Sequence, residues 1–168
     1  DTIAVQRMID EFVRMVGELP EEPSRGDLLK AGETLAALRT RLADQFASAQ
    51  ADMEKLTAAV AEREKSMSDS QKKSFEDERK KLIDNLQDVT TRFTDTDGAL
   101  QNLQGSLQGG AGGEAIDQIV ALGVGLSGLT QELALVKART RLETVTIPHV
   151  DLDSARALEI ARANRLDW

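Results

Sequence analysis

Side chains that could take part in chemistry are few in this chain of 168 residues, and they are scattered. His149 is the only histidine, and cysteine is absent, which excludes disulfides, thiolate metal sites and a cysteine nucleophile. A metal site at His149 would need more ligands, and a catalytic dyad would need a nucleophile at a defined turn. His149 instead follows Pro148 in an extended stretch, and we expect it to be structural or solvated.

The segment Asp95-Thr-Asp97-Gly98 has some of the residues of a calcium loop. Such a loop needs oxygen ligands at positions 1, 3 and 5, a glycine at position 6 and a glutamate at position 12. With Gly98 at position 6, Phe93 takes position 1 and Gln104 takes position 12, so the match fails. We predict no calcium site here, only a local defect in a coiled coil.

The segment Gln108-Gly-Gly-Ala-Gly-Gly113 places four glycines in six residues. A loop that cradles phosphate would need a Lys-Ser/Thr pair after the glycines and a strand before them, and both are missing. We therefore interpret the segment as a flexible connector. Carboxylates are plentiful, but none lies in a context that marks a cleft. The sequence predicts no enzyme, no cofactor and no metal.

Charge and hydropathy limit the partners of the chain. The formal net charge of -8 argues against nucleic-acid binding, which needs a basic patch, and against docking on anionic lipid. No uninterrupted run of about 18 apolar residues exists, so we expect no membrane-spanning helix. The chain begins at Asp1 without a methionine, and we interpret it as a piece of a longer protein.

The elements that must position these groups are helices, and one heptad ladder is the clearest sign of them. Its spacing of alternating four and three residues keeps one stripe facing a partner helix, as in a coiled coil. The ladder predicts a helix over 71–107. Arg79 and Thr96 are its polar rungs: Thr96 could set register, whereas Arg79 could do so or extend its charged end to water. The rungs are Phe75, Arg79, Leu82, Leu86, Val89, Phe93, Thr96, Leu100, Leu103 and Leu107.

A second ladder predicts a helix of similar length over 25–66, about 60 Å at 1.5 Å per residue. Ser24 can cap its start, with Asp27 as the partner in a capping box. The polar turn over 66–70 should join the two long helices into an antiparallel hairpin. Its rungs are Leu35, Leu38, Leu42, Phe46, Ala49, Met53, Leu56, Val60, Arg63 and Met67.

Three further helices are predicted, over 2–19, over 114–144 and from about 152. The first has a wide apolar face and should contact more than one neighbour. The rungs of the helix over 114–144 are Ile119, Leu122, Leu126, Leu129, Leu133, Val136 and Thr140. Within 114–144, Gly123, Gly125 and Gly128 suggest close approach of a neighbouring helix, or a kink. The predicted fold class is all-α, an elongated antiparallel bundle built on a long coiled-coil hairpin, which the first and fourth helices brace. Residues 1–145 form the bundle, and 146–168 form a linker and the start of another helix.

The last nineteen residues, 150–168, resemble the start of a repeat in TolC-like outer-membrane efflux proteins. Such repeats open with an apolar–polar–apolar cap and an Ala/Leu-rich helix, followed by an Asn-Arg-x-Asp-Leu motif. The segment Lys137-Ala-Arg-Thr-Arg-Leu-Glu143 also resembles the end of a periplasmic helix in that family. The matching residues are Leu152, Ala155, Leu158, Ala161, Asn164, Arg165 and Asp167, with Trp168 replacing the usual leucine.

The resemblance implies a periplasmic location, as part of a trimeric export duct in the outer membrane of a Gram-negative-type cell. Residues 1–145 lack the repeat and would be an enlarged periplasmic helical region. Its expected role is structure and protein contact, with either a periplasmic adaptor or another copy as partner. The hairpin tip, Met67, Ser68 and Asp69, is the candidate contact site. Two alternatives are a ligand-sensing helical bundle of a receptor, which needs a polar-lined pocket, and a plain coiled-coil scaffold.

Overall fold

The structure, a computed structural model, describes residues 2–109, 114–145 and 154–164, and within these ranges it contains five helices and no strand. The predicted all-α class is therefore confirmed. The helix boundaries agree with the predicted ones to within a few residues. The helices are α1 (Thr2–Gly17), α2 (Arg25–Glu64), α3 (Asp69–Gly109), α4 (Ala115–Thr144) and α5 (Ser154–Asn164).

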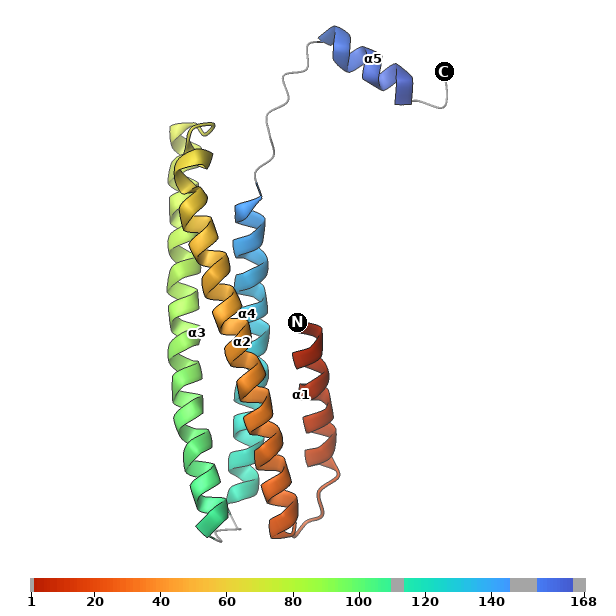
Figure 1. The fold of residues 1–168 in the computed structure, drawn as a ribbon, viewed down its shortest axis with the longest axis vertical. Helices are drawn as coiled ribbons and strands as arrows, with labels where there is room; N and C mark the ends of the chain where they lie inside the picture. Colours follow the sequence, from red (N-terminus) through yellow and green to blue (C-terminus); the bar gives the residue numbers. More distant parts are fainter. Residues whose placement is uncertain (1, 110–113, 146–153, 165–168) are drawn as a thin grey trace.

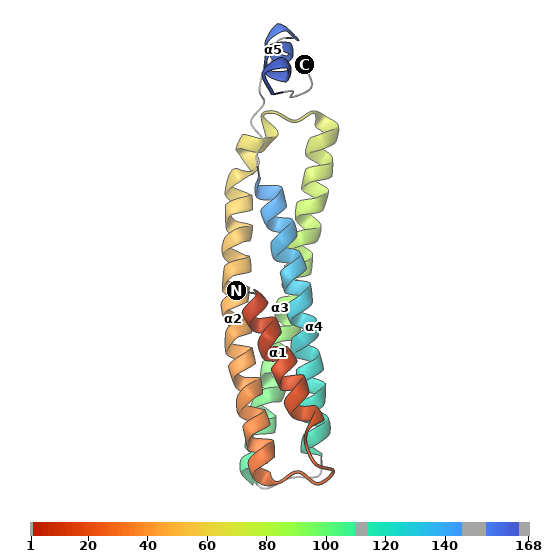
Figure 2. The ribbon, with the colours of Figure 1, turned by 90° about the vertical axis from the view of Figure 1, so that its right-hand side faces the viewer.

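Successive helices of the bundle alternate in direction, so that α2 and α4 run parallel to each other (Figure 1). These two helices are in contact along the middle of the bundle, with α3 packed on both of them. α1 also packs on both, but makes no contact with α3 (Figure 2). The predicted α2–α3 hairpin is present. α1 and α4 both pack against this hairpin, α4 on both of its arms and α1 on the α2 arm only.

The bundle has two halves that differ in helix number. α1 has 16 residues and α2 has 40, which correspond to about 24 Å and 60 Å of helix. Met15 of α1 contacts Thr34, and Phe12 contacts Gly123, so α1 covers only the lower part of α2 and α4. We call the part with α1, with residues 25–45, 92–109 and 115–133, the four-helix half. The three-helix half comprises residues 46–64, 69–91 and 134–144.

The core follows the predicted ladders closely. Every predicted rung of α4, from Ile119 to Thr140, is buried, as are those of α2 from Leu35 to Leu56. In α3 the seam weakens between Val89 and Leu100, where Phe93 and Thr96 are only half-buried. Phe93 still packs on Phe46, with ring centroids 4.7 Å apart. The polar rung Arg79 is half-buried as well.

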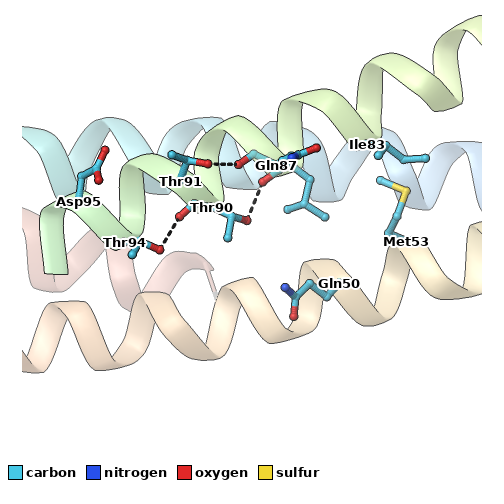
Figure 3. Close-up of a pocket in the computed structure, with 9 residues that line it drawn as sticks. Gln50, Met53, Ile83, Gln87, Thr90, Thr91, Thr94 and Asp95 are labelled. Atoms are coloured by element: carbon cyan, nitrogen blue, oxygen red, sulfur yellow. Dashed lines mark hydrogen bonds between the residues drawn. The ribbon is translucent and has the colours of Figure 1, made fainter. Parts of the chain in front are cut away.

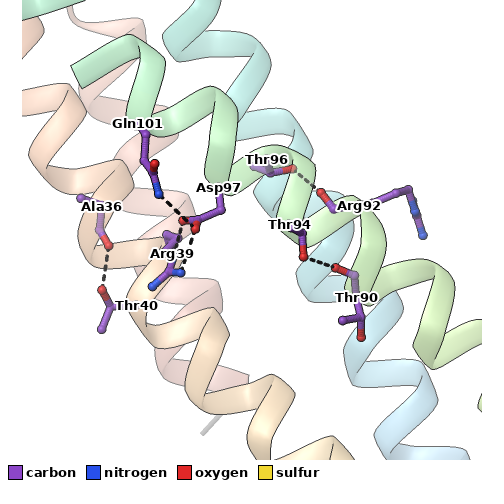
Figure 4. A network of polar contacts seen from close by, with 9 residues as sticks. All are labelled: Ala36, Arg39, Thr40, Thr90, Arg92, Thr94, Thr96, Asp97 and Gln101. Atoms are coloured by element: carbon purple, nitrogen blue, oxygen red, sulfur yellow. Dashed lines mark hydrogen bonds and ion pairs between the residues drawn. The ribbon is translucent and has the colours of Figure 1, made fainter. Parts of the chain in front are cut away.

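The segment with the partial calcium pattern is ordinary helix, and α3 continues through it unbroken. Asp97 accepts two hydrogen bonds from Arg39 of α2, at 2.6 Å from Nε and 3.1 Å from Nη2 (Figure 4). Gln101 adds a longer bond of 3.4 Å. Over the residues that the structure describes, no group of three His, Asp or Glu side chains could hold a metal ion. The bonds from Arg39 to Asp97 tie α3 to α2.

The three glycines of α4 do not share one purpose. A Cβ atom added to Gly123 would overlap the ring of Phe12, so this glycine allows the close approach of α1, as predicted. Added Cβ atoms at Gly125 and Gly128 would meet nothing within 4 Å. For these two, the expected close neighbour is not found among the described residues.

Two other features of the chain bear on its surroundings. By length and composition α4 could cross a membrane, with a mean hydropathy of 1.7 over its most apolar 18 residues, of which 44% are buried in the bundle. The central helix of a bundle passes the same test. α5 makes no contact with the other four helices, and its Leu158 and Ile160 are about half exposed.

Candidate functional site

The predicted contact site lies at the end of the α2–α3 hairpin, in a turn built from backbone and capping bonds. After Glu64, three successive amides donate to carbonyls three residues earlier, ending with Met67 N to Glu64 O at 3.3 Å. Ser68 then precedes α3: its amide and hydroxyl both donate to Gln71 Oε1, at 2.9 Å each. The turn is therefore ordered by its own residues.

Arg63 anchors this turn to the bundle. Its guanidinium lies 4.5 Å from the centroid of the Phe75 ring, in a cation–π arrangement, and its Nη1 is 3.4 Å from Glu143 Oε2. One side chain of α2 thus contacts both α3 and the last turn of α4. These contacts position the turn relative to all three long helices.

The three predicted contact residues have different surroundings. Met67 is half-buried and packs against the core, whereas Ser68 and Asp69 are exposed. The carboxylate of Asp69 has Lys72 Nζ at 4.0 Å, an open surface pair. The accessible part of the tip is therefore small, polar and supplied by the start of α3. Met67 contributes mainly to packing.

A buried polar seam lies between α2 and α4 in and beside the three-helix half. Lys137 Nζ donates to Gln45 Oε1 at 2.6 Å, and Arg141 Nε donates to Asp52 Oδ2 at 2.6 Å. Gln45, Asp52 and Lys137 are each 8% exposed. This seam was not predicted from the sequence. Its only sign was charged and amide residues beside the apolar rungs, at positions where a helix with one dry face would carry alanine or leucine.

The charges of this seam shift two pKa values. Burial raises the pKa of Asp52, but the hydrogen bond and charge of Arg141, with Lys55, outweigh it and hold the pKa below its usual value. Burial lowers the pKa of Lys137, and the nearby Arg141 lowers it further, against the opposing effect of Asp52. The seam therefore consists of a favourable ion pair next to a poorly solvated ammonium group.

An open groove of about 550 Å³ runs between α2 and α3 on the side away from α4 (Figure 3). Its wall on α3 is a row of threonines that donate their hydroxyls to their own helix, such as Thr90 to Leu86 O at 2.7 Å and Thr94 to Thr90 O at 3.1 Å. Met53 and Ile83 supply apolar surface at the other end. Asp95 is the only ionisable group of the lining.

These features define a class of architecture: an elongated all-α bundle with an exposed hairpin tip. Within the described residues, every buried side-chain nitrogen or oxygen has a hydrogen-bond partner. Comparisons with protein-family models, with curated proteins and with solved structures found no match to this chain. His149, Arg165 and Asp167 lie outside the residues that the structure describes. Asn164, the first residue of the Asn-Arg-x-Asp part of the TolC-like segment, belongs to α5, but its side chain is not described.

Proposed function

We propose that the chain is a non-catalytic periplasmic helical module of a TolC-like outer-membrane efflux protein, acting in structure and partner contact. The observation that carries the proposal is the pairing of a hairpin about 60 Å long with a separate helix, α5, which falls on the segment that resembles the family's repeat. A long bundle next to such a repeat suits a part that extends from a duct.

The tip is the proposed contact site because it combines order with exposure. Capping bonds of Ser68 and the anchoring contacts of Arg63 fix its conformation before a partner arrives, which lowers the entropic cost of binding. Ser68 and Asp69 present hydroxyl and carboxylate groups to a polar or basic surface. The ligand-sensor alternative has less support, because the buried polar groups pair with one another and the α2–α3 groove is open.

Cell fractionation tests the exporter assignment. Antibodies raised against the bundle should detect the native protein in the outer-membrane fraction, with the bundle digested by protease only after the outer membrane is opened. Detection in the cytosol would contradict the assignment, whatever the tip does.

Photo-crosslinking tests the tip separately. A photoreactive residue at position 69 of the native protein should join it to a second periplasmic protein, identified by mass spectrometry. The same residue at the exposed position 80 of α3, away from the tip, is the control and should give no such product. A correct location with equal crosslinking at both positions would remove the tip role and leave the exporter assignment standing.

A further inference from the structure

The outward face of α4 has features that the packing of this chain does not explain. α4 is buried along its inner seam, yet Val124 is 68% exposed, Leu135 54% and Leu142 71%. A helix that is apolar on both faces is typically covered on both. We define the outer stripe of α4 as Val120, Val124, Gly128, Gln131, Leu135, Ala138 and Leu142.

The spacing of the outer stripe indicates what kind of surface would cover it. Its steps are 4-4-3-4-3-4, the heptad pattern of a helix seam with one stutter. At 100° per residue, the stripe lies on the side of α4 opposite the inner seam. A second helix therefore fits this face better than a sheet or a flat surface.

The glycines of α4 support a close contact on this side. Each glycine costs about 1 kcal/mol relative to alanine within a helix. Gly123 accommodates Phe12, but the space outside Gly125 and Gly128 is open. Beside them, Val13, Val16, Val120 and Val124 line an open hollow of about 420 Å³ between α1 and α4. Small residues next to an apolar hollow would let another backbone approach closely.

The distribution of charge along α4 favours a second copy of the same helix, in antiparallel orientation, as the partner. Asp117 lies near its lower end and Arg139 near its upper end, both exposed, and each is eleven residues from Gly128. In an antiparallel pair of α4 helices that cross at Gly128, Asp117 of each copy lies opposite Arg139 of the other. The same register sets Leu135 opposite the small Ala121, each seven residues from Gly128. A parallel pair would instead bring like charges together.

We propose that two copies of this chain pair through the outer stripe of α4, antiparallel, with the helices crossing near Gly128. The interface is isologous, because the same face of α4 in each copy meets across a twofold axis at Gly128. The proposal names a surface on the bundle other than the hairpin tip, and it does not rest on the exporter assignment. Arg139 also has Glu78 of its own chain at 3.9 Å, a weak pair that leaves guanidinium N–H groups available.

Sedimentation equilibrium of the 168-residue chain is the first test, and a dimer that dissociates on dilution is expected. Val124→Glu should abolish the dimer, because a charge would be buried at the seam. Ile83→Glu is the matched control: Ile83 is an exposed apolar residue of α3, 38% exposed, on another face. It should leave the dimer intact. Circular dichroism of both variants establishes that they fold.

Charge reversal tests the direction of pairing. Asp117→Arg alone should weaken the dimer, and adding Arg139→Asp should restore it, because the two charges then face each other again with opposite signs. A wild-type chain that sediments as a monomer at every concentration would overturn the proposal. A dimer that is unaffected by Val124→Glu, or a double variant in which the dimer is not restored, would overturn it too. So would a monomer that binds phosphatidylcholine vesicles by α4 in a flotation assay.

Discussion

The two halves of the bundle use different chemistry at the same helix pair. In the four-helix half, α1 seals the groove between α2 and α4, and the pair is dry: Leu35, Ile119 and Leu126 are at most 1% exposed. In the three-helix half no described helix covers that groove. Gln45 and Lys137 pair across the boundary between the halves, and within the three-helix half α2 and α4 are joined by Asp52–Arg141 and Arg63–Glu143.

The difference shows how one helix pair adapts to water on one side. Polar groups at a half-open seam can form their remaining hydrogen bonds with water. In a sealed core, every donor and acceptor must instead be satisfied by other protein groups, at a desolvation cost. Arg141 illustrates this: its side chain is 61% exposed although it bonds the buried Asp52. Parallel helices have no short turn that connects them, and polar pairs at fixed positions favour one offset of α2 against α4 over others.

The largest predicted effect compares one buried leucine from each half. Leu35→Ala and Leu56→Ala each remove a fully buried side chain, and such changes cost about 2–5 kcal/mol. We expect Leu35→Ala near the upper end, because four helices surround the core in that half and limit collapse of the cavity. Leu56→Ala should fall near the lower end, because the thinner half can relax. Urea unfolding followed by circular dichroism measures both; equal losses would show that α1 adds no constraint.

The next effect concerns the contact between α1 and α4. Gly123→Ala places a methyl group against the ring of Phe12, and we expect a loss of about 1–3 kcal/mol from overpacking. Gly125→Ala, two residues along the same helix, is the control and should gain up to about 1 kcal/mol in a monomeric chain, because its surroundings are open. Chemical denaturation gives both values. A stabilising Gly123→Ala would mean that α1 does not lie against α4.

Sequence periodicity alone predicted most of the fold. The ladders of α2, α3 and α4 identified their buried rungs because heptad spacing allows only one stripe of each helix to face inward. The capping box of Ser24 and Asp27 was also predicted, and it forms with Asp27 N 3.2 Å from Ser24 Oγ. Such features depend on residues close together in the sequence.

Features that depend on the arrangement of helices were not predicted. Asp52 and Lys137 are charged residues beside an apolar ladder, a pattern that usually marks a solvated face; only the parallel contact of α2 and α4 buries them. The roles of Gly123 and Gly125 also differ only because α1 ends up beside one of them. For the tip, the sequence identified the exposed Ser68 and Asp69, and it placed Met67 both on the ladder of α2 and in the contact site; the structure shows Met67 packed against the core.

The ion pair of the polar seam should give a smaller, pH-dependent effect. Because the pKa of Asp52 is lower in the folded chain, its contribution is complete above the unfolded value of about 3.9 and is lost as the pH falls through the folded value. Asp52→Asn should therefore cost about 1 kcal/mol at pH 7 and reduce the loss of stability below about pH 4. The control Asp88→Asn, in an exposed pair with Arg92, should cost less than about 0.5 kcal/mol. Urea midpoints across pH 2–7 test this, and an unchanged acid profile would contradict it.

The smallest net effect should come from replacing the Gln45–Lys137 pair as a unit. Gln45→Leu alone leaves the buried ammonium of Lys137 without its partner at 2.6 Å and should cost about 1–3 kcal/mol. In the double variant Gln45→Leu/Lys137→Met no polar group is left unpaired, and its stability should lie within about 1 kcal/mol of the wild type at pH 7.

The pH dependence of the same double variant separates a buried cation from a simple loss of packing. The fold lowers the pKa of Lys137, so the charged form is penalised at neutral pH, and the wild type gains stability as the pH rises through the folded value towards the unfolded one near 10.4. The double variant lacks this gain. Stability relative to the wild type should therefore decline in alkaline solution, as measured by urea unfolding at pH 7 and pH 10. If the relative stability were the same at pH 7 and pH 10, burial would not penalise the ammonium of Lys137. The seam between α2 and α4 in the three-helix half would then be hydrated like an ordinary protein surface.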